Sequence, residues 1–196
     1  MREGLSLIID AQPDMRMIAS AATGEEGVDL FCRCRPDIVL MDLQLPSMTG
    51  LQAMHRIRLE DPVARIIVLT MYQGDEDIHR ALQAGAITYV LKDALTQDLI
   101  RIVREVHAGE HPILPDIDHR LADRLSRSAL TTREVEILKL LATGMRNKEI
   151  ASVMGISEET LKVHNKHIYA KLRVNDRTAA VTTGLQHGII HLPTSR

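Results

Sequence analysis

Three side chains that together could carry out phosphoryl transfer each follow a short apolar run of the sequence. They are Asp42, Thr70 and Lys92. A carboxylate can act as a nucleophile and form an acyl phosphate, while an ammonium and a hydroxyl can hold the new phosphoryl oxygens. A single Asp in such a place is often only a turn or helix-cap residue. Three such residues after successive apolar runs favour the chemical interpretation.

A second group of candidate residues lies on a helix that the sequence predicts over Glu158–Arg173. Its helical spacing gives an apolar face and a polar face. The apolar face holds Leu161, His164, Ile168 and Leu172, and the polar face holds Lys162, Val163, Asn165, Lys166 and Lys171. Cations mixed with an amide and a small apolar group can contact both the phosphates and the base edges of DNA. The plainer alternative is a helical hairpin whose lysines only face water.

The segment before this helix has the layout of a helix-turn-helix motif. Asn147–Met154 carries its apolar residues on one face of a short predicted helix. Gly155 supplies the backbone freedom that a sharp turn needs. Ser157 can then accept a hydrogen bond from the free N–H groups that begin the next helix. This layout suits a helix that enters a groove of DNA.

The phosphoryl-transfer candidates need a scaffold, and the first half of the chain predicts a parallel α/β sheet. Apolar runs alternate with amphipathic segments, as in sheets that helices cover on both faces. The predicted strands are Met15–Ala21, Asp37–Met41, Arg65–Thr70 and Ile87–Leu91, and the predicted helices are Gly24–Cys34, Leu51–Leu59, Glu76–Ala84 and Gln97–His107. Because ligands bind at the carboxyl ends of such strands, the three candidates should meet at one edge.

Charge divides the 196-residue chain into two unlike halves. Residues 1–107 carry 11 Lys+Arg and 16 Asp+Glu, whereas residues 131–196 carry 10 and 6. An acidic half followed by a basic half fits a regulatory domain attached to a nucleic-acid binder. We expect an α/β domain over 1–108, a linker with a short helical turn over 109–128 and an all-α domain over 129–196. No apolar run is long enough to span a membrane and no signal-peptide pattern is visible, which predicts a cytoplasmic protein.

Cysteine and histidine patterns do not indicate a metal site. Cys32 and Cys34 are the only cysteines, and residues two apart on a helix point in different directions. We therefore expect both thiols to be reduced and structural. Two histidine pairs have helical ligand spacing, but neither has an acidic or cysteine partner. These pairs are His164 with His167 and His187 with His191.

The helical segment resembles the DNA-binding domain of LuxR-type transcription regulators. The matching strings are Leu130-Thr131-x-Arg133-Glu134, Asn147-Lys148-Glu149-Ile150-Ala151, Gly155-Ile156-Ser157 and Thr160-Leu161-Lys162-Val163-His164. The resemblance implies that Lys162, Val163 and Lys166 face the groove of double-stranded DNA, with Thr160 near the phosphate backbone. It also implies that the last helix, predicted over Arg177–Ile190, supports a homodimer on DNA.

The first half resembles the receiver domain of two-component response regulators, a flavodoxin-like fold. The matching strings are Ile38–Pro46 with Gly50, Ile67–Thr70 and Ala84–Asp93. The resemblance implies that Asp42 is the phosphoacceptor, Thr70 the switch hydroxyl, Tyr89 the switch aromatic and Lys92 the phosphate partner. A receiver joined to a LuxR-type domain is the layout of the NarL/FixJ-like subfamily. It implies a transcription regulator controlled by phosphorylation of Asp42 in a phosphorelay with a sensor histidine kinase.

The start of the sequence departs from the receiver pattern. A receiver begins with a strand that ends in two acidic residues, which hold the Mg²⁺ used in phosphoryl transfer. Here Arg2–Leu5 already resembles the helix after that strand, so Asp42 is the only obvious carboxylate and its Mg²⁺ site should be weak. Three explanations are open: the sequence starts inside a longer protein, the sheet closes up beside the Asp42 strand, or the receiver is degenerate. Because the absent strand is central in the family, we expect low stability and a tendency to associate.

Two other classes of function fit the sequence less well, and we do not expect an enzyme. A haloacid-dehalogenase-like phosphatase would need a second Asp at the position of Gln44. A small-molecule receptor would need an aromatic-lined pocket, but the chain has no Trp, one Phe and three Tyr. The nearer alternative is a DNA-binding regulator with a degenerate receiver that acts independently of phosphorylation.

Overall fold

The computed structural model describes residues 2–70, 74–92, 96–112, 124 and 128–191 of the chain. These residues form two compact units. The first unit is drawn from residues 2–70 and 79–112, and the second from residues 74–78, 124 and 128–191. No helix in these ranges is both long enough and apolar enough to cross a bilayer.

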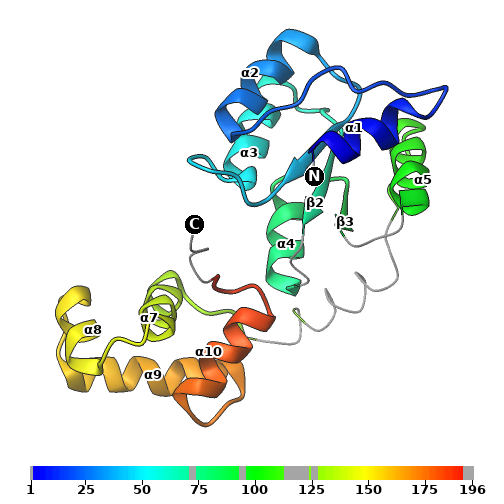
Figure 1. Ribbon diagram of the computed structural model, residues 1–196. Helices are drawn as coiled ribbons and strands as arrows, with labels where there is room; N and C mark the ends of the chain where they lie inside the picture. The colour runs from blue at the N-terminus through cyan, green and yellow to red at the C-terminus, as the bar shows by residue number, and fades with distance from the viewer. Residues whose placement is uncertain (1, 71–73, 93–95, 113–123, 125–127, 192–196) are drawn as a thin grey trace. The chain divides into compact units, whose positions relative to one another are not determined.

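The first unit is built on a parallel sheet of three described strands, in the order β1-β2-β3 (Figure 1). The strands are β1 (Val39–Asp42), β2 (Ile66–Thr70) and β3 (Thr88–Leu91). All five residues of β2 are buried, as expected for a central strand that helices cover on both faces. In this register Asp42 lies beside Leu69, and Thr70 lies beside Leu91. The ends of the three strands are therefore adjacent.

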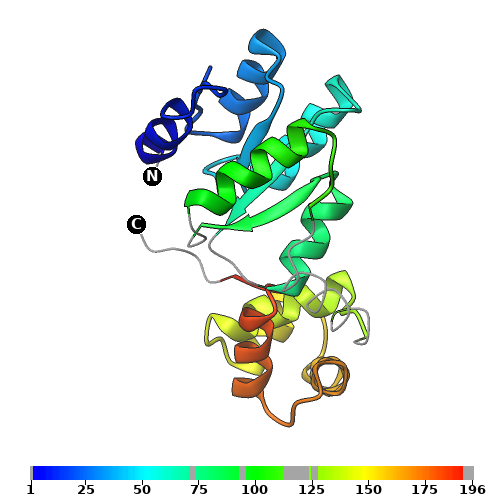
Figure 2. The same cartoon turned by 90° about the vertical axis from the view of Figure 1, so that its right-hand side faces the viewer.

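Four whole helices and residues 79–83 of a fifth, α4, belong to this first unit. They are α1 (Arg2–Asp10), α2 (Gly24–Cys34), α3 (Gly50–Glu60), α4 (Asp75–Gln83) and α5 (Thr96–His107). Figures 1 and 2 show α5 on one side of the sheet and α3 on the other. On the α5 side, the sheet residues Ile67, Leu69 and Val90 pack against the apolar stripe of that helix. The stripe consists of Leu99, Ile102, Val103 and Val106.

The predicted strand over Met15–Ala21 is wrong. The chain there forms no strand and joins no sheet. Met17 instead donates its backbone N–H to Asp10 Oδ1 at 2.8 Å, and Ile18 is 49% exposed. An apolar run becomes a strand only when a neighbouring strand completes its hydrogen bonds. The neighbour in the family's order, its first strand, is not among the described elements. The described part of β1 pairs with β2 alone. No other described strand has therefore moved into the place beside β1 that the family's first strand would take.

The other predicted elements of the α/β region are confirmed, with ends within two residues of the prediction. The starts of α2 and α3 are fixed locally by side-chain caps. Thr23 accepts a hydrogen bond from the backbone N–H of Glu26 at the start of α2. Thr49 forms a capping box with Gln52 at the start of α3, directly after the loop that follows Asp42. The predicted linker lies mostly outside the described residues.

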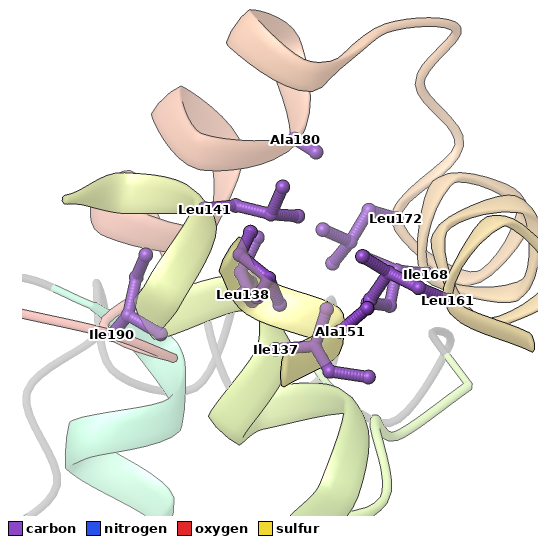
Figure 3. Close-up of a cluster of buried hydrophobic side chains, with 10 residues drawn as sticks. Ile137, Leu138, Leu141, Ala151, Leu161, Ile168, Leu172, Ala180 and Ile190 are labelled. Atoms are coloured by element: carbon purple, nitrogen blue, oxygen red, sulfur yellow. The ribbon is translucent and has the colours of Figure 1, made fainter. Parts of the chain in front are cut away.

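The second unit contains α7 (Thr132–Ala142), α8 (Asn147–Met154), α9 (Glu158–Leu172) and α10 (Arg177–Gln186). Figure 3 shows the apolar core that joins them. The buried core residues are Ile137, Leu138, Leu141, Ile150, Ala151, Leu161, Ile168, Leu172, Ala180 and Ile190. The predicted bounds of α8 and α9 are confirmed to within one residue. The last helix ends at Gln186, before the predicted Ile190, because Gly188 adopts a positive φ of 67° that breaks the helix.

Candidate functional site

Asp42 and Lys92 form an ion pair at the carboxyl edge of the sheet. Lys92 Nζ donates to Asp42 Oδ2, and the side chains are 10% and 26% exposed respectively. The other carboxylate oxygen, Oδ1, accepts a hydrogen bond from the backbone N–H of Gln44 at 3.0 Å. The carboxylate is therefore held in one orientation and is still open to solvent on one side. A partly exposed, oriented carboxylate beside a cation suits a nucleophile whose product is more negative than its reactant.

Thr70 and Tyr89 are both buried, on β2 and β3 respectively. Thr70 ends the central strand β2, and its carbonyl oxygen accepts a hydrogen bond from the backbone N–H of Lys92 at 2.9 Å. Its side chain is fully buried. Tyr89, on β3 beside Val68, is 1% exposed. The structure thus brings Asp42 and Lys92 into direct contact and sets Thr70 on the strand between them.

Gly50 lets α3 begin against the end of β1. A Cβ added at Gly50 would lie 2.0 Å from the Asp42 carbonyl oxygen and 2.8 Å from Leu43 Cα. The backbone N–H of Gly50 also donates to the carbonyl oxygen of Leu43 at 3.0 Å. The sequence showed this glycine only as part of a motif. The reason for it is a close backbone approach, which no residue with a side chain allows.

The residues at this edge do not fit a tightly bound Mg²⁺ ion. Magnesium prefers octahedral oxygen ligands that include carboxylates, and Asp42 supplies one. Nowhere in the described part of the chain do three or more His, Cys, Asp or Glu side chains gather as a metal site. Cys32 and Cys34 are free thiols.

The face of α9 that the sequence predicted for DNA contact is exposed. Ser157 caps the helix, because its hydroxyl accepts a hydrogen bond from the backbone N–H of Thr160 at 3.1 Å. The polar residues that follow lie open to solvent, and Val163 is 53% exposed among them. The exposed residues of this face are Thr160, Lys162, Val163 and Lys166.

Two residues assigned to this polar face are elsewhere in the structure. Asn165 is 7% exposed and lies in the buried stripe with Leu161 and Ile168. Lys171 turns toward α7, where its Nζ is 2.7 Å from Glu134 Oε2. Positions 161, 165 and 168 share one side of a helix by their spacing of three and four. The predicted apolar face was wrong at this position, because it included the half-buried His164 in place of Asn165.

Glu134 connects α7 to α9 through a buried carboxylate. Its Oε2 also accepts from the backbone N–H of Thr131 at 2.7 Å, as part of the capping box that begins α7. Burial raises the pKa of Glu134, but the hydrogen bonds from Lys171 and Thr131 outweigh it and hold the pKa below its usual value. The pair spans 37 positions of the chain, so no local pattern could have revealed it.

The turn of the helix-turn-helix is fixed by two further contacts. Gly155 ends α8 in the left-handed conformation, with φ of 65° and ψ of 37°. Arg133 of α7 donates to the carbonyl oxygen of Met154 at 2.7 Å, so it satisfies a carbonyl at the end of α8. Both α8 and α9 are therefore tied to α7, which sets the direction in which α9 presents its exposed face.

Two family descriptions match the chain over consecutive regions. The response regulator receiver domain matches residues 1–104, and the luxR family of bacterial regulatory proteins matches residues 128–183. Response regulator protein VraR of Staphylococcus aureus (strain Mu3 / ATCC 700698) is 35% identical over 195 residues, which cover 97% of this chain and 93% of VraR. The chain is a response regulator of the LuxR family.

Solved structures agree with this membership. The response regulator ChrA of a heme-sensing two-component system is 35% identical to this response regulator, with a TM-score of 0.55, and the match covers 96% of this chain and 92% of ChrA. RcsB of Salmonella enterica serovar Typhimurium, bound to the promoter P1flhDC with BeF3⁻, has a TM-score of 0.69. That match covers 94% and 92% of the two chains at 20% identity, and shows a shared fold.

This response regulator is a DNA-binding transcription regulator controlled by phosphorylation. Its fold is a parallel-sheet α/β receiver domain followed by an all-helical LuxR-type DNA-binding domain. Both parts of the resemblance seen in the sequence are confirmed.

Proposed function

We propose that Asp42 is the phosphoacceptor of this response regulator and that Lys92 and Thr70 hold the phosphoryl group. The ion pair between Lys92 and Asp42 is the observation that carries the proposal. A buried or partly buried lysine beside a strand-end carboxylate places a positive charge where the phosphoryl oxygens would lie. We also propose that the receiver spans residues 1–108, the linker 109–128 and the DNA-binding domain 129–196.

The chemistry follows from the geometry of the carboxylate. One oxygen of Asp42 attacks the phosphorus of a phosphohistidine on a sensor histidine kinase, the P–N bond breaks, and the imidazole leaves. The acyl phosphate carries more negative charge than the carboxylate, so it attracts the Lys92 ammonium and the Thr70 hydroxyl. Movement of Thr70 gives Tyr89 a new neighbour and changes one face of the receiver. Receiver domains generally bind Mg²⁺ for this step, and Asp42 would supply one of its oxygen ligands.

The exposed face of α9 supports the proposal that this helix enters the major groove. Lys162, Val163 and Lys166 would contact base edges and phosphates, and Thr160 the backbone. A homodimer would place two such helices on half-sites about one helical turn apart or a multiple of it. Replacing Lys162 by Met should weaken binding by about 1–3 kcal/mol if it reads a base. Uniform weakening over all sequences would instead indicate a phosphate contact.

The phosphoacceptor is tested by intact mass after incubation with acetyl phosphate, with and without Mg²⁺. The parent chain should gain one phosphoryl adduct, and the Asp42→Asn variant should gain none. Asp37→Asn, which removes an exposed carboxylate before β1, is the matched control and should keep the adduct. Lys92→Met should lower the yield of the adduct. An adduct that persists in Asp42→Asn would rule out this assignment.

A regulator that acts independently of phosphorylation is the second candidate. It is favoured by the described part of the strand edge, where Asp42 is the one carboxylate and makes a poor site for Mg²⁺. In that case acetyl phosphate would leave both the mass and the DNA affinity of the parent chain unchanged. Asp42→Asn would then bind DNA as tightly as the parent under both conditions.

A further inference from the structure

A cavity of about 370 Å³ lies at the amino edge of the sheet, where β2 and β3 begin. This is the edge opposite to Asp42, which ends β1. The cavity is lined by the end of α3, the loop between α3 and β2, the residue before β3 and the turn after α5. Small-molecule sites in proteins have volumes of this size. The phosphoryl-transfer residues and α9 take no part in it.

The inner part of this cavity is apolar. Val106 of α5 is fully buried, Ala64 is 6% exposed and Ile87 is half-buried. Val63 also lines the cavity but is 80% exposed, so it stands at the rim. A ligand with an apolar body would remove these surfaces from water, which favours binding.

Two half-buried guanidinium groups line the cavity, and neither has a carboxylate partner in the described part of the chain. The Arg65 side chain makes no hydrogen bond or ion pair with any described residue. The Arg58 guanidinium donates only to backbone carbonyl oxygens, those of Pro62 and Gly85. Charges that are partly removed from water are normally paired. Arg65 therefore has the capacity to bind an anion, and Arg58 adds to the positive potential.

The remaining charged groups of the lining are exposed. Glu110 and His111 both lie in the turn after α5 and open to solvent. Water and salt screen charges in such positions much more strongly than half-buried ones. The inner part of the cavity therefore keeps the positive sign of the two arginines. Glu110 at the rim disfavours a ligand with a high negative charge, so a singly charged acid fits best.

The walls of the cavity are held in place by hydrogen bonds between separate segments. Arg58 joins the loop after α3 to the turn before β3, because it donates to Pro62 and, at 2.9 Å, to Gly85. Thr88 Oγ1 donates to the carbonyl oxygen of Pro112 at 2.6 Å, which fixes the chain after α5 against the start of β3. A site with fixed walls loses little conformational freedom when a ligand binds.

We propose that this cavity binds a small organic acid that carries one carboxylate on an apolar body. The body would lie against Ala64, Ile87 and Val106, and the carboxylate would pair with the guanidinium of Arg65. A guanidinium presents its N–H groups as a fork that matches the two oxygens of a carboxylate. The site is independent of the phosphoryl-transfer and DNA-binding roles proposed above.

The test titrates the full ¹⁵N-labelled chain with benzoate and follows the backbone amide signals of residues 63–65, 87 and 109–111. These signals should shift and reach saturation. Acetate has the carboxylate without the ring, and benzamide has the ring without the charge. Each analogue should bind roughly 10-fold more weakly than benzoate, since it lacks one of the two contacts. Equal affinity for benzoate and either analogue, or no saturable shift with benzoate, would overturn the proposal.

Removal of the Arg65 charge tests the ion pair directly. Arg65→Gln should weaken benzoate binding roughly 10-fold, as expected for a lost charge-assisted contact. The variant should fold like the parent, because the Arg65 side chain has no partner among the described residues. Arg56→Gln, at an exposed position of α3 outside the cavity, is the matched control and should bind like the parent. Parent-like affinity in Arg65→Gln would overturn the proposal.

A second pair of variants tests the sign of the ligand's charge without a change to Arg65. Val63 is 80% exposed at the rim, so a charged residue at this position leaves the core of the domain intact. Val63→Glu should weaken benzoate binding and Val63→Lys should strengthen it, each by roughly 2- to 5-fold as for exposed charge pairs. Benzamide binding should be the same in both variants. Equal benzoate affinities in Val63→Glu and Val63→Lys would overturn the proposal.

Discussion

Lys171 near the end of α9 and Glu134 in the first turn of α7 form an ion pair, with Nζ and Oε2 2.7 Å apart. Glu134 is 5% exposed and Lys171 is 27% exposed in their side chains. The same carboxylate oxygen accepts from Thr131. The pair holds the C-terminal part of α9 against α7, so Lys171 orients the helix and lies outside the face proposed to contact DNA.

Replacing Lys171 by Met should lower the free energy of unfolding by about 1–3 kcal/mol, since it leaves a buried carboxylate with fewer donors. Urea unfolding at neutral pH measures this loss. The salt dependence of DNA binding should not change, which distinguishes Lys171 from a phosphate-contacting lysine. Lys139→Met, at an exposed position of α7, serves as control.

The stabilisation by this pair should depend on pH in a defined direction. The folded-state pKa of Glu134 is lowered from 4.5. Its contribution is therefore present above about pH 4.5 and is lost as pH falls through the folded-state pKa. The difference in stability between the parent and Lys171→Met should narrow in acid. A difference that widens on acidification would contradict the assignment of a charged Glu134.

Two glycine substitutions should have opposite effects. Gly50→Ala forces a Cβ to within 2.0 Å of the Asp42 carbonyl oxygen, so the end of β1 must shift. We expect a loss of about 1–3 kcal/mol, as for other overpacked sites, with a lower yield of phosphoryl adduct. Gly4→Ala in α1 meets no atom within 4 Å and should stabilise the chain by about 0.5–1 kcal/mol. Equal effects in thermal unfolding would reject the close-approach explanation.

Arg104 should stabilise the first unit near neutral pH through Asp14, and this stabilisation should be lost in acid. The guanidinium donates to Asp14 Oδ2 at 2.8 Å and to Oδ1 at 2.9 Å, and these bonds lower the pKa of Asp14 from 3.8 to about 2. A lowered pKa stabilises the folded state above pH 3.8, and the effect is lost as pH falls toward 2. Arg104→Gln should therefore unfold at lower urea than the parent near neutral pH. The difference in urea midpoint between Arg104→Gln and the parent should disappear below pH 3.8. A difference that stays constant over that range would exclude a contribution from the lowered pKa of Asp14.

Asn165→Leu should raise the stability of the helical unit. Leucine has nearly the shape of asparagine, and it removes the buried Oδ1 that has no partner in the described structure. Relief of an unsatisfied acceptor contributes up to about 1–3 kcal/mol, which calorimetry can detect as a higher melting temperature. A lower melting temperature would mean that the amide stabilises the fold through an interaction of its own.

The sequence by itself was sufficient for the local elements and for the strand-end residues. Apolar runs fixed β1, β2 and β3, and residues that directly follow such runs must lie at the carboxyl edge of a parallel sheet. Asp42, Thr70 and Lys92 can therefore be grouped from the sequence alone. The same holds for Ser157 and Gly155, whose capping roles depend on a few neighbouring positions.

The tertiary structure alone decided which polar residues are buried and which elements find partners. Met15–Ala21 has a strand-like sequence but no strand, because a ladder needs a neighbour and not only a propensity. Asn165 and Lys171 read as surface residues of α9, yet Asn165 is buried with Leu161 and Ile168, and Lys171 reaches Glu134, 37 positions away. Helical periodicity defines the angle between two side chains on one helix. It does not define which angle faces the core, since that depends on the packing of the other helices.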